Sequence, residues 1–397
     1  MSVAEIVRVA ARGDGVTADG RHAAFAAPGD LLHPDGALSP GPHHRTPPCQ
    51  HFPVCGGCQL QHLDDESYSA FVGDRVVGAL TAQGLAADVR LPILSPPHGR
   101  RRATLHAERR GRRVLLGFTE GASHRIVDMR ECWVLAPELF ALLAPLRGLL
   151  TTLMPDRGRA NIHLALTDRG PDVLIESKIA ESLAAAEGIV TFAERHGVAR
   201  IAVDEGLGPE TRWEPEPVTI TLGGVAVPFP PASFLQATRH GEAALVAAVR
   251  EAVGTPAATA DLFAGLGTFT FALPGKVYAA EAARDAILAL KAAAGAARRM
   301  VFAEHRDLFR RPLTPTELDR FDAVVIDPPR AGARDQVEQL AGSRVARIAY
   351  VSCNPSSFAR DAKLLCEGGY RLDWVQPVGQ FNWSTHVELA AAFSRQG

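Results

Sequence analysis

The sequence predicts an α/β fold, with a Rossmann-like domain and a parallel-rich sheet at residues 231–397. Short apolar runs typical of buried strands alternate there with helical stretches; the runs are ATADLF, KVYAAE, MVFAE, FDAVVID and RIAYVS. The first run ends in the glycine turn AGLG, which is typical of a tight strand-to-helix turn. A helix at about residues 234–253 precedes the runs, and the tail from Tyr370 predicts a closing strand pair.

The preceding residues, 49–230, predict a mostly β central domain. Two alternating runs are expected to form hairpins, one turning at Arg110-Gly111 and the other at residues 168–171. Helical stretches at residues 138–152 and 179–196 are expected to cover one face of this sheet.

The first 48 residues lack apolar periodicity and are rich in Gly, Pro and His. A small strand pair turning at Asp19-Gly20 is expected there, followed by a Pro-rich linker at residues 40–48. The predicted domains are therefore 1–48, 49–230 and 231–397.

Composition excludes some classes of protein. Hydrophobic residues make up 47% of the 397 residues and charged residues 22%, as in soluble globular proteins. The most apolar stretch, residues 139–154, is interrupted by Pro145 and Arg147, and the N-terminus lacks the layout of a signal peptide. We therefore expect a cytoplasmic monomer without a membrane segment. The net charge of −2 provides no overall attraction to nucleic acid, so an RNA partner would need local basic patches.

The six cysteines divide into groups. Cys49, Cys55 and Cys58 lie within ten residues of one another, which in a reducing compartment favours metal binding over disulfides. Cys132 is the remaining cysteine outside the C-terminal domain and is the candidate fourth ligand. Four thiolates can hold zinc or a four-iron cluster, and the residue types alone do not decide between them. Unrelated free thiols are the structural alternative, and Cys366 is expected to be a packing residue.

The glycine turn is the candidate cofactor site. Its residues Phe263, Gly265, Gly267 and Thr268 would bring the backbone and a helix N-terminus close to a ligand. Glu281, which ends the next apolar run, can accept hydrogen bonds from both ribose hydroxyls of a nucleoside.

Asp307, after the third run, could reach an adenine amine. This layout suits a nucleoside but does not by itself separate S-adenosylmethionine from NAD. NAD sites more often carry a third glycine, where this chain has Thr270. A plain structural turn is the alternative.

Three further motifs each end a predicted strand: Asp327-Pro-Pro-Arg, Ser-Cys353-Asn-Pro and His-Val-Glu388. Singly they could be a turn, a buried cysteine and a surface acid. Together they match the groups needed to methylate carbon 5 of uracil. That reaction needs a thiolate to add to carbon 6, an acid near the base edge, and a second carboxylate to remove the carbon-5 proton.

The motifs DLFAGLGTFT, VIDPPRAG, YVSCNP and HVE resemble, in order and spacing, those of the RNA 5-methyluridine methyltransferase family. The cysteine spacing and GGCQLQHL resemble its iron–sulfur-containing 23S rRNA branch. The resemblance covers about residues 49–397 and implies a class I methyltransferase domain that binds S-adenosylmethionine.

The same resemblance implies Cys353 as nucleophile and Glu388 as proton acceptor, with Asp327 beside cofactor and base. It also implies Gln236 at the cofactor, and an iron–sulfur cluster, with zinc as the alternative, on the four cysteines. Two features depart from the family. Thr238 stands where an asparagine is usual, and the N-terminal RNA-binding barrel is shorter than usual.

Local features suit RNA. Seven arginines within fourteen residues would form a basic edge on the first hairpin, although a solvated turn explains them nearly as well; they are Arg100, Arg101, Arg102, Arg109, Arg110, Arg112 and Arg113. Phe234 and Phe381 are candidates to stack on a uracil turned out of the RNA.

Three functions compete. The leading hypothesis is methylation of 23S rRNA. A tRNA uracil-5-methyltransferase is the alternative within the class, disfavoured because that branch typically lacks the cluster. A non-catalytic RNA-binding assembly factor on the same fold would have no chemical need for Cys353, Glu388 and Asp327 together.

Overall fold

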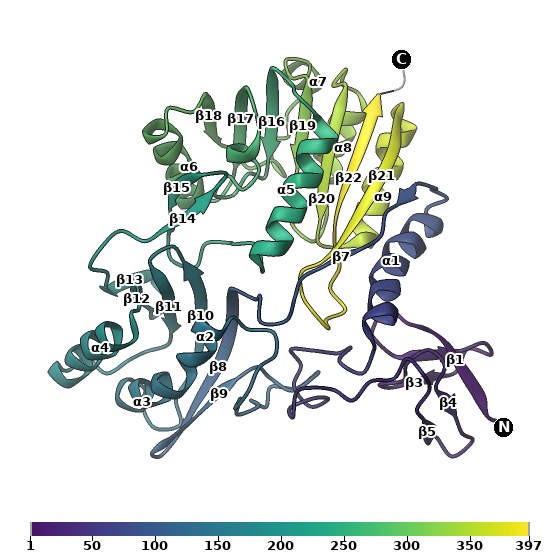
Figure 1. Ribbon diagram of the computed structural model, residues 1–397. Helices are drawn as coiled ribbons and strands as arrows, with labels where there is room; N and C mark the ends of the chain where they lie inside the picture. Colours follow the sequence, from purple (N-terminus) through teal and green to yellow (C-terminus); the bar gives the residue numbers. More distant parts are fainter. Residues whose placement is uncertain (1, 396–397) are drawn as a thin grey trace. The chain divides into compact units, whose positions relative to one another are not determined.

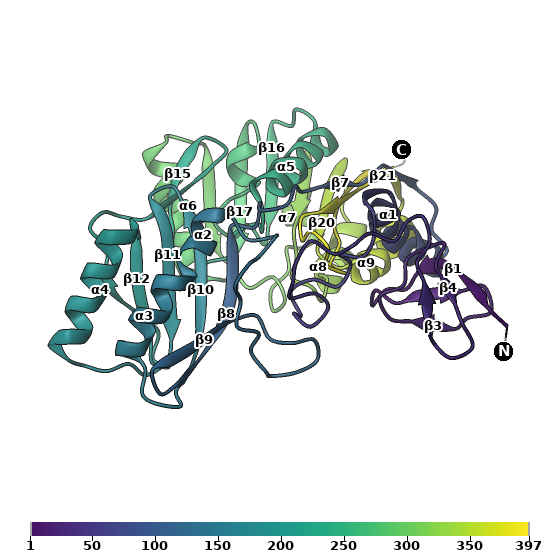
Figure 2. The ribbon, with the colours of Figure 1, turned by 60° about the horizontal axis from the view of Figure 1, so that its bottom comes forward.

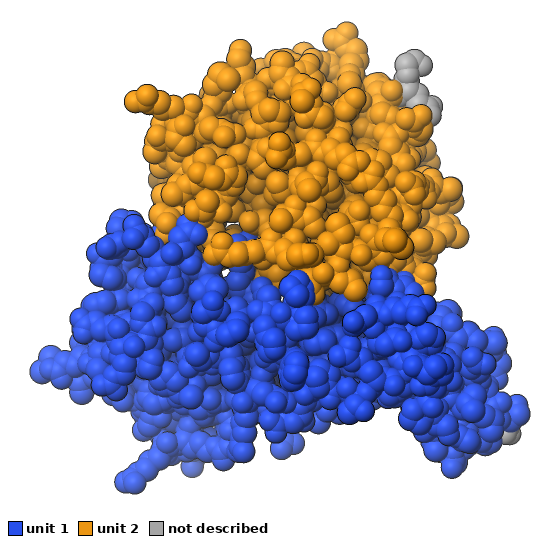
Figure 3. Space-filling view, viewed as in Figure 1, with its two compact units in different colours: residues 1–71, 96–218, 381–385 blue, residues 72–95, 219–380, 386–397 orange. Residues whose placement is uncertain are grey.

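The computed structural model describes residues 2–395, which form two compact units. Of the described residues, unit 1 comprises 2–71, 96–218 and 381–385, and unit 2 comprises 72–95, 219–380 and 386–395 (Figure 3). No helix among the described residues is long and apolar enough to cross a membrane.

A nine-stranded sheet forms the centre of unit 2. Its order is β18-β17-β16-β19-β20-β22-β21-β6, with β7 also paired to β21 (Figure 1). The main strands are β16 (Ala258–Leu262), β17 (Lys276–Glu281), β18 (Val301–His305), β19 (Ala323–Ile326), β20 (Arg347–Ser352), β21 (Tyr370–Gly379) and β22 (Glu388–Arg395). β16 to β20 run parallel, and β22 joins antiparallel to both β20 and β21. This confirms the predicted parallel-rich sheet and the closing strand pair.

Strand order reverses at β16, because β17 lies on one side of it and β19 on the other. In such sheets the crevice for a ligand lies beyond the carboxyl ends of the strands at this switch point. The glycine turn that follows β16 is therefore correctly placed for a cofactor.

Helices cover both faces of this sheet. The helices are α5 (Arg239–Val253), α6 (Arg284–Ala296), α7 (Pro315–Leu318), α8 (Arg334–Ala341) and α9 (Pro355–Glu367). The apolar face of α5 packs on Ala349 and Val351 of β20. Phe358 of α9 instead contacts Tyr350. Tyr350 lies between Ala349 and Val351 in β20, so its side chain points to the opposite face of the sheet. Helices α5 and α9 thus lie on opposite faces, which is why these strands are apolar throughout.

Helix α5 begins later than predicted, at Arg239 rather than about Phe234. Thr238 has extended backbone angles, and its hydroxyl accepts a hydrogen bond from Gly241 N at 2.9 Å. Threonine is a good N-cap because its side chain satisfies an amide that has no partner within the helix. The cap sets this boundary.

Some elements of unit 2 were not predicted. β6 (Asp88–Val89) and β7 (Ile93–Leu94) run parallel to β21, and β14 (Thr219–Leu222) and β15 (Val225–Pro228) form a hairpin. Helix α1 (Asp65–Ala82), of which residues 72–82 belong to unit 2, was also missed. Its Gly73 and Gly78 weaken helix propensity, so burial of its apolar side has to compensate.

The main sheet of unit 1 has the order β13-β12-β11-β10-β8-β9 (Figure 2). Its strands are β8 (Arg102–Arg110), β9 (Arg113–Gly117), β10 (Arg159–Thr167), β11 (Gly170–Glu176), β12 (Arg200–Asp204) and β13 (Pro209–Trp213). Both predicted hairpins are present, as β8–β9 and β10–β11. Helices α2 (Pro137–Ala141), α3 (Leu143–Leu153) and α4 (Leu183–His196) pack against one face, as predicted.

The N-terminal residues form more structure than the predicted strand pair. Five short strands pair in the order β3-β2-β1-β4-β5: β1 (Ala4–Val9), β2 (Gly15–Thr17), β3 (His22–Ala23), β4 (Leu31–Leu32) and β5 (Leu38–Ser39). Ile6, Ala23, Ala26 and Leu32 form their small core. The turn predicted at Asp19-Gly20 does connect β2 to β3. Strands of two or three residues are too short to show alternation, which explains the missed ones.

Candidate active site

The glycine turn after β16 places two glycines for different reasons. Gly265 has φ 55° and Gly267 has φ 94°, which are backbone conformations that residues with a side chain rarely adopt. A Cβ on Gly267 would lie 2.7 Å from the Phe271 ring, whereas one on Gly265 would meet nothing within 4 Å. Gly267 therefore allows close packing, and Gly265 borders open space suited to a ligand. Phe263 and Thr268, half-buried, flank the turn, and Phe263 has a left-handed φ of 63°.

Glu281 ends β17 with its carboxylate at the glycine turn. One oxygen accepts from Gly265 N at 2.9 Å and the other from Ala283 N at 2.7 Å. The side chain is thereby held beside the open space at Gly265. Its position fits the ribose-binding role expected for it.

Asp307 lies just beyond β18. Its Oδ1 accepts from Phe309 N at 3.0 Å, and the Phe309 ring lies 5.4 Å from that of Phe263. Asp307 and the glycine turn thus border the same part of the sheet edge, which fits contact with an adenine.

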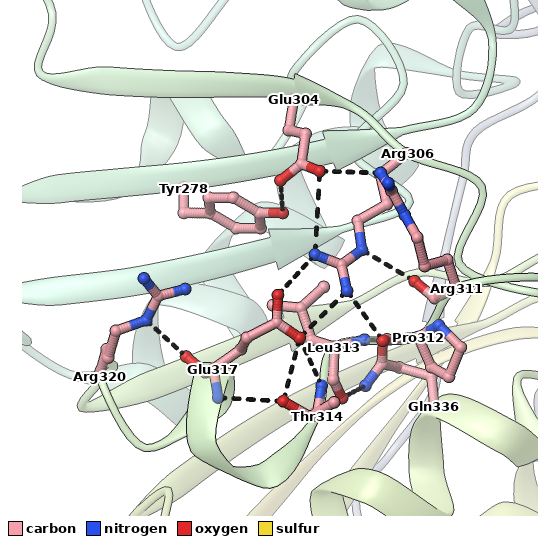
Figure 4. Close-up of polar contacts among 10 residues, drawn as sticks. All are labelled: Tyr278, Glu304, Arg306, Arg311, Pro312, Leu313, Thr314, Glu317, Arg320 and Gln336. Carbon is pink, nitrogen blue, oxygen red and sulfur yellow. Dashed lines mark hydrogen bonds and ion pairs between the residues drawn. The ribbon is translucent and has the colours of Figure 1, made fainter.

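A buried arginine network holds the segment that follows β18 (Figure 4). Arg306 donates to Glu317 at 2.8 and 3.1 Å and to the carbonyls of Arg311 and Pro312 at 2.8 and 2.9 Å. Such a bidentate, multiply bonded guanidinium fixes geometry better than a single ion pair does. Because Arg306 adjoins Asp307, the network fixes the backbone at the expected adenine end of the site.

Asp261, at the end of β16, is fully buried beneath the glycine turn. Its Oδ2 accepts from the Thr270 hydroxyl at 2.5 Å, and its Oδ1 has no hydrogen-bond partner among the described residues. Burial raises the pKa of Asp261 from 3.8 to about 7. This group was not a predicted site residue, because nothing local to a strand signals a buried carboxyl.

We expect Asp261→Asn to flatten the pH dependence of stability. Since the folded pKa exceeds the unfolded one, the stabilisation from this carboxyl is complete below about pH 4 and is lost as the pH rises through about 7. The loss amounts to about 4 kcal/mol over that window. Thermal unfolding at about pH 5 and about pH 8 should show that the stability of the variant relative to wild type is greater at the higher pH. Exposed Asp285→Asn is the control, and parallel curves for Asp261→Asn and wild type would contradict the assignment.

The three predicted reacting groups meet at one edge of the sheet. Asp327 follows β19, Cys353 follows β20, and Glu388 begins β22. Ser352 pairs with Leu389 across β20 and β22, so Cys353 and Glu388 occupy the next positions of the same ladder. The edge is the carboxyl end of β19 and β20, where the glycine turn also lies.

Burial and neighbouring charges shift the pKa values of two of these groups. Burial raises the pKa of Cys353 to about 11, with the charges of Glu388 and Asp327 adding to the shift. Burial, again aided by Glu388, raises the pKa of Asp327 well above its usual range. A raised pKa favours the protonated form of Asp327, which can donate a hydrogen bond. The raised pKa likewise favours the protonated Cys353 thiol over the reactive thiolate, unless a further interaction lowers that pKa.

The first turn of α9 ties the Cys353 loop to the Asp327 loop. Asn354 Nδ2 and Ser357 Oγ each donate to the carbonyl of Arg330 at 3.0 Å. Asp361 Oδ2 accepts from Ala333 N at 2.9 Å and from the Tyr350 hydroxyl at 2.6 Å. Asp327 and Cys353 therefore sit on loops that are braced against each other.

Gln236 is buried, and its Oε1 accepts from Gln380 Nε2 at 2.8 Å. Gln380 Oε1 in turn accepts from Ala237 N at 3.1 Å. Thr238 contacts Ser95 Oγ at 2.7 Å in addition to capping α5. The threonine that departs from the family pattern thus has a structural task of its own.

The four cysteines of the predicted cluster lie close together in unit 1. Burial raises the pKa of Cys49 to about 11 and that of Cys58 to about 12, and in both cases the charges of Cys132 and Cys55 add to the shift. The four thiols line one small cavity together with Phe118 and Trp133. Among the described residues, no group of three or more His, Cys, Asp or Glu side chains is arranged to hold a metal ion as it stands. The cluster therefore stays a prediction.

The protein surrounds these thiols with specific contacts. A Cβ on Gly57 would lie 3.0 Å from the Phe118 ring, so a side chain there would crowd the cysteine loop. Arg100 lies close enough to Cys55 and Cys132 for its charge to lower the pKa of both, against the upward shift from burial. A set of four soft donors beside a half-buried cation suits an anionic metal–thiolate group.

The basic edge is smaller than predicted. Arg100 lies at the cysteines and Arg101 is 2% exposed. Residues alternate along β8, and Arg101 lies in phase with the buried Ala103 and Leu105 just beyond it. The exposed arginines at the tip are Arg110, Arg112 and Arg113. Of the two aromatic candidates for stacking on the uracil, Phe234 is 61% exposed. The centre of the Phe381 ring lies 5.5 Å from the guanidinium carbon of Arg100.

Comparison with known proteins decides the family. Residues 233–396 match the family described as tRNA (Uracil-5-)-methyltransferase. An uncharacterized RNA methyltransferase of Zymomonas mobilis is 50% identical over 98% of this chain and 99% of its own length. The 23S rRNA (uracil(1939)-C(5))-methyltransferase RlmD of Pectobacterium atrosepticum is 30% identical over 90% of this chain and 81% of its own. The chain belongs to the RNA uracil-5-methyltransferase family. It is an S-adenosylmethionine-dependent RNA (uracil-5-)-methyltransferase, as the motifs predicted.

A solved structure shows the same fold. The tRNA (uracil-54, C5)-methyltransferase of Pyrococcus abyssi, in complex with S-adenosyl-L-homocysteine, is 24% identical and superposes with a TM-score of 0.75, covering 98% of this chain and all of the other. This confirms the predicted α/β class for the uracil-5-methyltransferase described above.

Proposed function

We propose that this enzyme methylates carbon 5 of a uridine in 23S rRNA, using Cys353 as a covalent nucleophile and Glu388 as the base. The observation that supports this most is the placement of Cys353, Glu388 and Asp327 at one sheet edge with mutually shifted pKa values. The similarity to a relative named for 23S rRNA favours that substrate over tRNA.

In the proposed reaction the Cys353 thiolate adds to carbon 6 of the uracil, and the ring electrons move to make carbon 5 nucleophilic. S-adenosylmethionine supplies the methyl group to that carbon. Protonated Asp327 donates a hydrogen bond at the base edge, where negative charge develops. The Glu388 carboxylate then takes the carbon-5 proton, the carbon–sulfur bond breaks, and Cys353 is released.

The cofactor fits the residues described. We assign its ribose to Glu281, its adenine to Asp307, and its remaining contacts to Gln236, Asp327 and the turn formed by Phe263, Gly265, Gly267 and Thr268. Open space at Gly265 and the orientation of Glu281 support this assignment.

We also propose that Cys49, Cys55, Cys58 and Cys132 hold a four-iron cluster, and that residues 1–48, 49–230 and 231–397 act as RNA-binding, cluster-bearing and methyltransferase parts of a cytoplasmic monomer. Methyl transfer needs no electron, so the cluster has a structural or RNA-positioning task.

A trapping experiment tests the proposed function. Purified enzyme, S-adenosylmethionine and RNA containing 5-fluorouracil should give a covalent protein–RNA adduct, because the base cannot remove a fluorine. Ribosomal and transfer RNA are tried in parallel, and the nucleotide attached to Cys353 is mapped. An adduct on 23S rRNA supports the proposal; an adduct on tRNA alone would replace the substrate, and no adduct on either would refute the covalent mechanism.

The cluster has its own test. Protein purified without oxygen should contain about four irons per chain, and Cys132→Ser should lose most of them together with the visible absorbance. Cys366→Ser, a cysteine on α9, serves as the matched control and should keep its iron. Zinc in place of iron, or equal iron in Cys132→Ser and wild type, would contradict the assignment.

A further inference from the structure

Five residues of the connection between β21 and β22 belong to unit 1, although both strands belong to unit 2. This stretch, residues 381–385, is the FNWST segment, and Glu388 follows it after only two further residues. The FNWST segment is therefore directly continuous with the chain that leads into the proposed base.

The partner of the FNWST segment is the cysteine loop. The amides of Gln59 and Leu60, which directly follow Cys58, both donate to the Trp383 carbonyl, at 2.8 and 2.9 Å. Trp383 is 3% exposed and has a left-handed φ of 56°. A non-glycine residue keeps such a conformation only where its surroundings impose it, and this strain is often found at functional positions.

The side chain of Gln59 completes the link. Its Nε2 donates to the carbonyl of Gly56, inside the Cys55–Cys58 loop, at 2.7 Å. Its Oε1 accepts from the amide of Thr385, three residues before Glu388, at 3.4 Å. One amide group thus bridges the cysteine loop and the end of the FNWST segment.

Further contacts hold the start of the segment. The Tyr68 hydroxyl donates to the Phe381 carbonyl at 3.2 Å, and the Arg45 guanidinium lies 5.7 Å from the Trp383 ring. Gln61, by contrast, accepts from Cys49 N at 3.2 Å and serves the cysteine loop itself. The two glutamines that flank Leu60 thus have separate tasks.

We infer that Gln59 is a positioning residue that couples the cysteine loop to Glu388, so that an ordered loop is needed for the proton-removal step. This inference rests on the proposed function. In that step the Glu388 carboxylate takes the carbon-5 proton. The electron pair of the broken carbon 5–hydrogen bond forms the carbon 5–carbon 6 double bond, and the carbon 6–sulfur bond breaks to release the Cys353 thiolate.

Gln59→Ala tests the coupling. Addition of Cys353 and methyl transfer precede the step that needs Glu388, so the variant should add to 5-fluorouracil RNA at the wild-type rate. On ordinary uracil RNA its elimination should be about 10- to 100-fold slower, because small misplacements of a reacting group have effects of that size. A methylated covalent adduct should then accumulate, visible as a shifted band on a denaturing gel. Iron content should equal that of wild type.

Gln50→Ala is the matched control, since Gln50 is an exposed glutamine in the same cysteine segment. Gln59→Glu keeps an acceptor for the Thr385 amide but loses the donor to the Gly56 carbonyl, so the bridge is broken and its elimination should be slowed as in Gln59→Ala. Hydrogen exchange at Thr385 should be faster in Gln59→Ala and unchanged in Gln50→Ala.

The outcomes separate the two ideas. If wild type forms the fluorouracil adduct but Gln59→Ala accumulates no adduct on uracil RNA, the coupling is overturned and the proposed function stands. If Gln59→Ala and Gln50→Ala slow elimination equally, the effect belongs to the loop in general and the role of Gln59 is overturned. If wild type forms no fluorouracil adduct, the proposed function fails first.

Discussion

Replacing Cys353 by serine should lower the rate of uracil methylation by about 10,000-fold or more, because removing a covalent nucleophile has effects of this size. A serine hydroxyl fills nearly the same space but ionises far less readily than a thiol. The rate is measured as transfer of labelled methyl groups from S-adenosylmethionine to RNA. Cofactor binding, followed by calorimetry, should change little.

Cys366→Ser is the matched control, because it makes the same exchange on α9, the helix that follows Cys353. It should leave methylation within about twofold of wild type. Substantial methylation by Cys353→Ser, or a fluorouracil adduct with that variant, would rule out Cys353 as the nucleophile.

Glu388→Gln should separate the reactivity of Cys353 from turnover. Loss of the base should slow turnover by about 100- to 10,000-fold and leave the methylated adduct on ordinary RNA. Burial is the main cause of the raised pKa of Cys353 and the charge of Glu388 adds to it, so removing that charge should lower the pKa part of the way towards its usual value. Alkylation of Cys353 by iodoacetamide at mildly alkaline pH should therefore become faster, as followed by mass spectrometry of its peptide.

Glu338→Gln removes an exposed carboxylate that pairs with Arg334 at 2.9 Å, and it should change neither measurement. Slower alkylation in Glu388→Gln would mean that the carboxylate activates the thiol instead of opposing it. Normal turnover in Glu388→Gln would exclude it as the base.

The raised pKa of Cys353 implies that the thiol has to be activated when the cofactor and substrate bind. In the free enzyme burial and the neighbouring carboxylates raise the pKa of Cys353 to about 11, which favours the neutral thiol at physiological pH, and burial raises the pKa of Asp327 as well. The positively charged sulfonium of the cofactor would favour the thiolate once bound nearby. We therefore expect thiol reactivity to depend on cofactor binding, which avoids a permanently reactive cysteine.

Local sequence patterns determined the elements of the methyltransferase domain. Apolar runs with helical stretches between them predicted β16 to β20 almost residue for residue, because buried parallel strands need continuous apolar sequence. The same runs placed Gly265, Asp327 and Cys353 at strand ends, and the carboxyl ends of parallel strands share one edge. The site could therefore be predicted without coordinates.

Other features depended on contacts that no local pattern records. The inward direction of Arg101 follows from the phase of β8, and the start of α5 follows from the Thr238 cap. The raised pKa of Asp261 comes from burial, which only packing defines.

The sequence alone predicted the chemistry proposed for this protein, because the motifs carry the candidate reacting groups in a characteristic order and spacing. Tertiary structure decided what surrounds them. Gln59 and Thr385 lie 326 residues apart in the chain, and their hydrogen bond joins a cysteine loop to the approach to Glu388. No local sequence pattern around Gln59 or Thr385 predicts that the two residues meet, because their hydrogen bond depends on the tertiary fold of the chain.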